Sequence, residues 1–383
     1  MRHSAAYLMP AMLLLALSCQ ERTVTQRHPV SYVTEIISDA SCAEHKLLYG
    51  RNPDARDEAI FLAGPPEEVF QLARAFMKAD YFDNSTGGAV PDSIPDFSGE
   101  TFAGILDELY SPYGAQLAGG NETLLREVAA KAAVMAVDTS CFVSPYDREG
   151  GLVKVSSKLI VLTSSCMAAY GQFDVDTLFR ALGCNIPVLS PLQCMMDEIF
   201  AETDGEDVHV GVVAPRSSLS SGVYSSLFSA HCRNLGLEGS RCTVLAGRDS
   251  VSVIAGFFDD YIASGATEPL DYLIVDDFGA DREELLADVS RMVSVMSPES
   301  LKYREFFAKD FKLLTPAEAI LKGCYAKMRS NGLFSFRISR PASCYYLTVR
   351  APESLGRSFM LIPFTERYAS ESTLESYTEY VQD

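Results

Sequence analysis

The chain has 383 residues, of which 48% are hydrophobic and 22% are charged. This is the composition of a globular protein, and it excludes a disordered or collagen-like chain. The 32 Lys and Arg residues are outnumbered by 51 Asp and Glu residues, so the formal net charge is −19. A nucleic-acid or anionic-membrane surface is therefore excluded, because phosphate binding needs a basic face. At about 150 residues per domain, the length predicts two or three domains.

The N-terminus has the pattern of an export signal. Arg2 precedes a short apolar core, which is too short to cross a membrane as a mature helix. The sequence Ala16-Leu17-Ser18-Cys19 resembles the bacterial lipobox, although that motif usually has Leu where this chain has Ala16. The resemblance implies a signal peptide over 1–18 and a palmitate-type acyl anchor on Cys19. An ordinary secretory signal, cut elsewhere, is the alternative.

The Cys and His residues allow only a modest conclusion about thiol pairing and metal binding. If Cys19 carries lipid, nine of the ten Cys residues remain, and an odd number leaves at least one thiol unpaired. The five His residues and the absence of a C-x-x-C motif leave no spacing typical of a zinc site. We therefore expect no metal site, and most of the thiols are interpreted as small buried apolar groups.

Residues 57–203 alternate between apolar strands and amphipathic helices, after a tether and lead-in over 19–56. The strand–helix order predicts a parallel sheet covered by helices. Strands are expected at 59–63, 158–163 and 185–190, and helices at 67–80, about 100–117, 122–137, 174–182 and 192–201.

The polar sequence around 202–206 separates a second unit of the same kind over 206–300. Its strands are expected at 208–214, 243–246 and 272–275, and its helices at 224–235, 251–264 and 281–296. Short runs at 334–338, 344–349 and 359–364 predict a mixed C-terminal segment over 301–383, with an antiparallel edge or return strands. The fold class is therefore α/β, with two doubly wound, Rossmann-like lobes and a helical insertion.

The turns after these strands are candidate binding positions, because ligands of open α/β sheets lie beyond the carboxyl ends of the strands. Small or polar residues dominate the turns, although turns are often built that way for conformational reasons alone. The candidate ligand-binding residues taken from the strand ends are Gly64, Ser165, Cys166, Tyr170, Ser218 and Asp276.

A loop over 83–100 is rich in Asp, Gly and Pro. Carboxylate and amide oxygens on such a restrained loop suit a hard cation or sugar hydroxyls, although an ordinary surface loop is the alternative. Its candidate ligand-binding residues are Asp83, Asn84, Asp92 and Asp96.

The sequence carries no P-loop, G-x-S-x-G, H-E-x-x-H or G-x-G-x-x-G motif, and no cofactor is expected. Thr163-Ser164-Ser165-Cys166 at a strand end resembles the cofactor-independent aspartate/glutamate racemases. Those enzymes have two α/β halves, each with one Cys after a central strand. The matching turn of the second half holds Asp276-Asp277 instead, which departs from a pair of thiols.

The region from Val208 to Pro215, followed by a Ser/Gly-rich turn, resembles half of a type I periplasmic solute-binding protein. We therefore favour a lipid-anchored envelope protein that binds a small polar solute between two lobes, without catalytic activity. The alternatives are a racemase-like enzyme using Cys166 and an envelope assembly lipoprotein. The expected partners are a small polar ligand, the bilayer through the acyl anchor and other envelope proteins, with no nucleic acid. The expected location is the periplasmic or outer-membrane face of the cell envelope.

Overall fold

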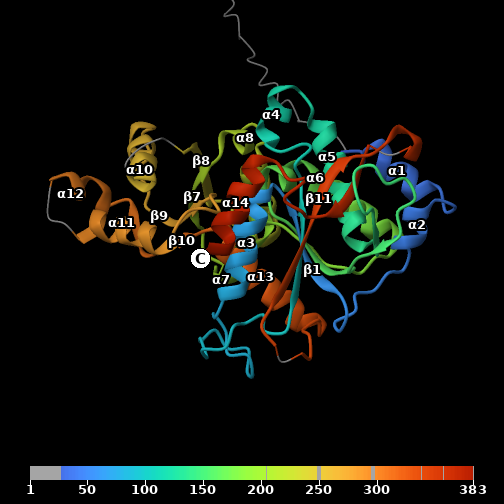
Figure 1. Cartoon of the computed structure of the whole chain (residues 1–383). Coiled ribbons are helices and arrows are strands. Elements are labelled where there is room, and N and C mark those ends of the chain that lie inside the picture. Colours follow the sequence, from blue (N-terminus) through green and yellow to red (C-terminus); the bar gives the residue numbers. More distant parts are fainter. Residues whose placement is uncertain are drawn as a thin grey trace, which may run out of the picture.

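The computed structural model describes residues 27–203, 205–247, 252–294, 298–337, 339–356 and 358–382. Cys19 lies outside the described residues, so the predicted lipidation stays a prediction. No helix among the described residues is both long and apolar enough to cross a bilayer. The chain forms two α/β lobes, each built around one sheet (Figure 1).

The first lobe contains a six-stranded sheet with β1 (Ala59–Gly64) near its centre. β1 pairs in parallel with β2 (Thr101–Leu106) and β5 (Ser157–Leu162), and all six residues of β1 and of β5 are buried. Such continuous burial is typical of a parallel strand covered on both faces. β12 is the antiparallel edge. In spatial order the strands are β12 (Phe359–Pro363), β11 (Ala342–Arg350), β2 (Thr101–Leu106), β1 (Ala59–Gly64), β5 (Ser157–Leu162) and β6 (Val188–Leu189).

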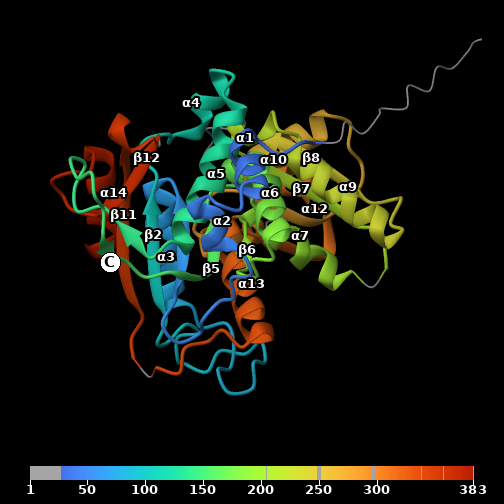
Figure 2. The ribbon, with the colours of Figure 1, turned by 90° about the vertical axis from the view of Figure 1, so that its right-hand side faces the viewer.

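Alternate residues of β1 belong to different apolar clusters. Ile60 and Leu62 pack on one face, whereas Phe61 and Ala63 pack on the other, as the two-residue period of a strand requires. The first face is covered by α3 (Pro66–Lys78), α7 (Pro191–Glu202), α13 (Pro316–Asn331) and α14 (Glu371–Gln382). The second face is covered by α1 (Ser31–Ser38), α2 (Ala43–Leu48), α5 (Glu122–Val137) and α6 (Ser165–Leu182). α4 (Tyr113–Ala118) lies above the sheet (Figure 2).

The second lobe contains a four-stranded parallel sheet. Its strands, in spatial order, are β10 (Phe307–Leu314), β9 (Leu270–Val275), β7 (His209–Ala214) and β8 (Arg241–Ala246). Its helices are α8 (Arg216–Leu219), α9 (Val223–Leu235), α10 (Val253–Ala263), α11 (Arg282–Ser294) and α12 (Pro298–Arg304). The minor elements of the chain are the hairpin β3 (Ser140–Cys141) and β4 (Leu152–Val153), and the 3₁₀ turn η1 (Glu353–Leu355).

The two lobes share an apolar core. One cluster of buried residues contains Leu62 of the first sheet and both Val210 and Ile274 of the second. The segment 301–383 contributes to both lobes, because β10 completes the second sheet while β11 and β12 form the edge of the first. The predicted return strands are thus confirmed, and the α/β class with parallel lobes is confirmed as well.

Two predictions of local structure are wrong. Residues 100–117 are predicted as helix, but Thr101–Leu106 is the parallel strand β2. A short apolar run does not distinguish a buried strand from a helix by its periodicity, and burial beside β1 decides the outcome. Residues 334–338 are predicted as strand, but 334–337 form none, while the unpredicted β10 lies at 307–314.

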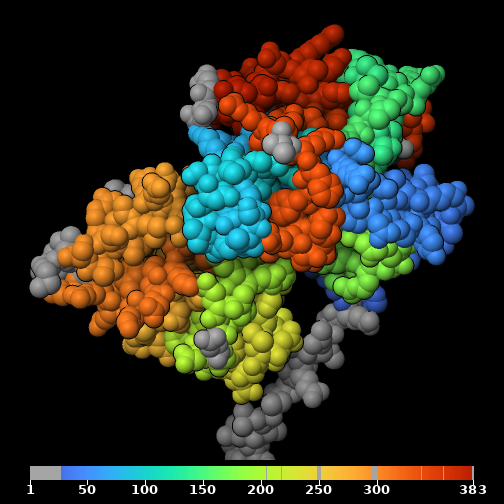
Figure 3. Space-filling model, turned by 90° about the horizontal axis from the view of Figure 1, so that it is seen from below, coloured from blue at the N-terminus to red at the C-terminus, as the bar shows by residue number. Residues whose placement is uncertain are grey.

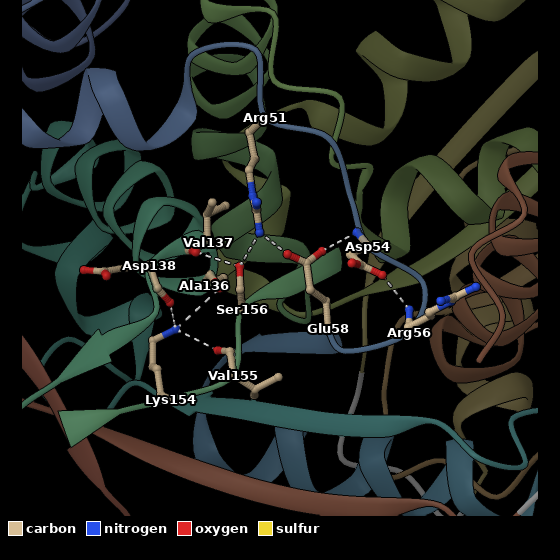
Figure 4. A network of polar contacts seen from close by, with 10 residues as sticks. All are labelled: Arg51, Asp54, Arg56, Glu58, Ala136, Val137, Asp138, Lys154, Val155 and Ser156. Atoms are coloured by element: carbon tan, nitrogen blue, oxygen red, sulfur yellow. Dashed lines mark hydrogen bonds and ion pairs between the residues drawn. The ribbon is translucent and has the colours of Figure 1, made fainter. Parts of the chain in front are cut away.

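A polar network occupies the amino ends of β1 and β5 (Figure 4). Arg51 pairs with Glu58, which accepts a hydrogen bond from the Asp54 backbone N–H. The buried Lys154 donates to the backbone oxygens of Asp138 and Val155, and its Nζ lies 4.7 Å from the centre of the Phe61 ring. Burial lowers the pKa of Lys154 to about 8. Through its hydrogen bonds to these backbone oxygens, Lys154 connects the end of α5 to the start of β5.

Candidate active site

A cavity of about 500 Å³ lies between the lobes, at the carboxyl ends of β1, β5, β7 and β9. In Figures 1 and 2 this is the upper end of the sheets, where α4 lies. The position fits the rule that parallel sheets bind ligands at the carboxyl ends of their strands. Its polar and charged lining comprises Glu67, Glu68, Gln71, Ser164, Ser165, Arg216, Ser218, Asp276 and Asp277, and Cys166 adds a thiol.

A second cavity, of about 480 Å³, adjoins the first. The two cavities share Glu67, Glu68, Ser164 and Cys166 as lining residues. The second cavity is otherwise lined by the start of α4, by Glu108 and by hydroxyl groups at the start of α14. The four shared residues thus stand where the two cavities meet, and a molecule occupying both would pass across Glu68 and Cys166.

The turn after β1 places the two glutamates. A Cβ at Gly64 would lie 2.1 Å from Thr163 Oγ1, so β1 must end in glycine to approach the end of β5. Pro65 and Pro66 then start α3, and Glu67 and Glu68 follow in its first turn. Acidic residues are favourable at a helix N-terminus. From the sequence, Glu67 and Glu68 are therefore expected only to stabilise the start of α3.

Asp276, at the end of β9, links the two lobes. Ser165 Oγ donates to Asp276 Oδ1 at 2.7 Å, and the Tyr224 hydroxyl donates to Oδ2. The side chain is only 6% exposed, and burial raises its pKa, while the two hydroxyl donors oppose this shift. Both oxygens of Asp276 are thus already engaged by hydroxyl groups, one from each lobe.

Glu68 is a second carboxyl group of the cavity with a raised pKa. Thr163 Oγ1 lies 3.4 Å from Glu68 Oε2. The pKa of Glu68 is raised to about 8. Burial of the carboxyl group is the largest cause, and the nearby charge of Asp276 is the second. A carboxyl group in this range exchanges its proton near neutral pH, as a general acid or base must.

Asp107 follows β2, is nearly fully buried and contacts Tyr113, a lining residue of the second cavity. Its Oδ2 accepts from the Tyr113 hydroxyl at 3.0 Å, and its Oδ1 accepts from Thr348 at 3.1 Å. Burial raises the pKa of Asp107. Burial, assisted by the charge of Asp107, also raises the pKa of Tyr113 above its usual range, so this phenol stays protonated.

Four of the residues predicted from strand ends line the cavity, namely Ser165, Cys166, Ser218 and Asp276. Cys166 lies in the first turn of α6 and is 6% exposed. Gly64 acts through close backbone packing, as described above. Tyr170 is buried one turn further along α6 and lines neither cavity.

The loop residues Asp83, Asn84, Asp92 and Asp96 line neither cavity, so the structure does not bring them together with the candidate residues from the strand ends. α3 carries the chain to the opposite end of the sheet, where this loop lies beside α13 (Figures 1 and 3).

The oxygens of these loop residues are engaged within the loop itself. Asp96 accepts from the backbone N–H groups of Tyr81 and Phe82, and Asp83 from those of Ser85 and Thr86. Asp92 accepts from Asn84 and Ile94. The carboxylates cap the loop backbone, which explains an acidic composition without any ligand.

The sequence prediction missed Glu67, Glu68, Arg216 and Asp277. Glu68 is two residues beyond Pro66 in the same strand-end turn that was already a candidate. The position of Glu68 after a strand end could therefore have identified it from the sequence. Its raised pKa could not, because that depends on the second lobe lying against Glu68.

No protein-family model and no curated protein sequence matches the chain. Among solved structures, glutamate racemase from Francisella tularensis, in complex with D-glutamate, matches with a TM-score of 0.51 at 13% sequence identity. The match covers 85% of this chain and 94% of the racemase. The chain has a glutamate-racemase-like fold. A glutamate racemase isoform from Bacillus anthracis has the same identity and coverage, with a TM-score of 0.47.

The Francisella tularensis structure corrects the function expected from the sequence. The expected likeness to solute-binding proteins gives way to a likeness to enzymes, and the favoured reading, a binding protein without catalytic activity, is wrong. The sequence pattern misled because a strand, a Ser/Gly-rich turn and a helix are common to many doubly wound folds. At 13% identity the likeness shows the fold, and the chemistry has to be argued from the residues of the cavity.

Proposed function

We propose that the chain is a cofactor-independent racemase or epimerase that exchanges a proton at a carbon atom next to a carboxyl or carbonyl group. Glu68 and Cys166 are the two proton-transferring groups. Asp276 is a positioning residue that keeps the pKa of Glu68 high. The fold supports this class of reaction, and the chemistry of the cavity supports these residues.

The observation that carries the proposal is the meeting of Glu68 and Asp276, one from each lobe, at the same cavity. Two carboxyl groups held close in a buried site disfavour each other's charge. Burial is the main cause of the pKa of about 8 for Glu68, and the charge of Asp276 is the second. A pair of thiols is not available, because Asp276 and Asp277 occupy the turn in which the second thiol would stand.

The reaction needs one group on each side of the reacting carbon. The ionised Glu68 carboxylate removes the proton, and the electron pair moves into the neighbouring carbonyl group. The Cys166 thiol then delivers a proton to the opposite side of the carbon, which leaves Glu68 protonated and Cys166 as thiolate. The reverse direction exchanges these roles, so no oxidant, reductant or cofactor is consumed. Cys166 lies in the first turn of α6 and lines both cavities, as Glu68 does.

Proton exchange in deuterium oxide tests the proposal. The wild-type protein is incubated with each enantiomer of the common α-amino acids, and deuterium incorporation and inversion are followed by NMR and chiral chromatography. Glu68→Gln and Cys166→Ser should each reduce the rate of inversion at least a hundredfold. Each variant should still exchange deuterium into one enantiomer, because the remaining group still faces one side of the carbon.

Two control variants carry the same chemical change elsewhere. Glu122→Gln alters an exposed glutamate in the first turn of α5, and Cys42→Ser alters the thiol that caps α2. Both should keep wild-type exchange. Loss of activity in both controls, or full activity in Glu68→Gln, would refute the assignment.

A further inference from the structure

We infer that the substrate is an amino acid with a positively charged side chain. This inference rests on the proposed function, because it concerns the group that extends from the reacting carbon into the cavity. It goes beyond the racemase fold, which by itself says nothing of the side chain.

The first observation is the balance of charge in the lining of the two cavities. Three exposed or half-buried carboxyl groups, Glu67, Glu108 and Asp277, accompany the perturbed Glu68 and Asp276. Arg216 is the one cationic side chain among these lining residues. A second carboxylate on the substrate would be repelled by this lining, whereas an ammonium or guanidinium group would be attracted.

The second observation is an unused hydroxyl group in the cavity wall. Ser218 is 1% exposed, and its Oγ makes no hydrogen bond of normal geometry among the described residues. It lies close enough to the Tyr224 hydroxyl to oppose the rise in pKa that burial causes in that group. A buried polar group without a partner is costly. Ser218 lines the inter-lobe cavity beside Asp276 and Asp277, so a ligand that fills the cavity can supply the missing hydrogen bond.

The third observation places the two ends of such a substrate. Ser164 precedes α6 and makes no side-chain hydrogen bond to cap that helix. The first N–H groups of an uncapped 18-residue helix favour a carboxylate. With the substrate carboxylate there and the reacting carbon near Glu68 and Cys166, the side chain extends toward Asp277. Asp277 is exposed and lines the cavity, and the one hydrogen bond that its carboxylate accepts from the described residues is the turn bond from Gly279 at 2.9 Å.

Calorimetric titration with three probes tests the inference without requiring turnover. L-lysine should bind, L-norleucine should bind at least ten times more weakly, and L-glutamate should bind more weakly still. Lysine and norleucine share the same carbon chain, so their ratio isolates the terminal charge. Asp277→Asn should reduce lysine affinity about tenfold and leave norleucine unchanged. Asp310→Asn, an identical change on exposed β10, should alter neither.

The outcomes separate this inference from the proposed function. Binding of lysine without deuterium exchange would retain the substrate class and refute the racemase proposal. Exchange and inversion of glutamate would retain the racemase proposal and refute the cationic substrate. An unchanged lysine-to-norleucine ratio in Asp277→Asn, or no binding of lysine, would also overturn the inference.

Discussion

Ser165 and Asp276 join the two lobes through a hydrogen bond of 2.7 Å, from the first turn of α6 to the end of β9. The bond holds a buried carboxyl group of the second lobe against the turn that carries Cys166 in the first lobe. The electrostatics of Glu68 therefore depend on how the lobes are docked, and not on the first lobe alone.

Replacing Asp276 by Asn should move the pH dependence of proton exchange. Removal of the neighbouring charge lowers the pKa of Glu68 from about 8, although burial, the larger cause, still holds it above the ordinary value. The ascending limb of the exchange rate, which follows ionisation of the Glu68 base, should therefore shift to lower pH, as measured by deuterium incorporation between pH 5 and 10. Asp310→Asn serves as the control. An unshifted limb in Asp276→Asn would show that Asp276 does not tune Glu68.

Replacing Glu68 by Gln should stabilise the protein at alkaline pH. The folded pKa of about 8 exceeds the ordinary value of 4.5, so the folded state binds more protons than the unfolded state between these values. Wild-type stability should fall as pH rises through this window, by up to about 1.4 kcal/mol per pH unit. Glu68→Gln lacks this titration. Urea unfolding at pH 5 and pH 8.5 measures the free energy of unfolding of both proteins. The variant should become more stable relative to the wild type at pH 8.5, and an equal difference between the two proteins at both pH values would contradict the raised pKa.

Lys154 gives the opposite dependence on pH. Its pKa is lowered from 10.5 to about 8 by burial, so the folded state releases its proton first. Wild-type stability should therefore rise relative to Lys154→Met between pH 8 and 10.5, by up to about 1.4 kcal/mol per unit. Unfolding of both proteins at pH 7.5 and pH 10 measures the difference. A constant difference would mean that Lys154 is not perturbed in the folded chain.

Replacing Asp96 by Ala should destabilise the fold and leave ligand binding intact. Asp96 is 3% exposed and accepts from two backbone N–H groups, at 2.8 and 3.1 Å. Loss of these charged hydrogen bonds should cost about 2 kcal/mol, seen as a lower melting temperature. Asp83→Ala, in the exposed turn of the same loop, should cost less. Weaker lysine binding by Asp96→Ala at unchanged stability would support the binding role first predicted for the loop.

The anchor predicted at Cys19 has its own test. Wild-type protein expressed in a bacterium with its full N-terminus should partition into detergent, and Cys19→Ala should not. Mass spectrometry of the mature N-terminus identifies the acyl group. Partitioning of both proteins into the aqueous phase would refute the anchor.

The sequence alone determined the α/β class, most of the strands and four of the residues in the cavity wall. It could do so because buried parallel strands are apolar throughout, and because their carboxyl ends fall at positions that can be counted along the chain. Ser165, Cys166, Ser218 and Asp276 follow from that rule. The helical prediction over Thr101–Leu106 failed because a six-residue apolar run has no period of its own.

The tertiary structure decided which polar residues meet. Asp83 and Asp96 belong to a loop at the end of the sheet opposite the cavity, a placement that depends on the direction of α3. In the sequence, Glu68 is an ordinary glutamate at the start of a helix. Its raised pKa results from burial and from the nearby Asp276 of the second lobe. A pKa depends on burial and on neighbouring charge. Both are properties of the packed lobes, and the local sequence contains neither.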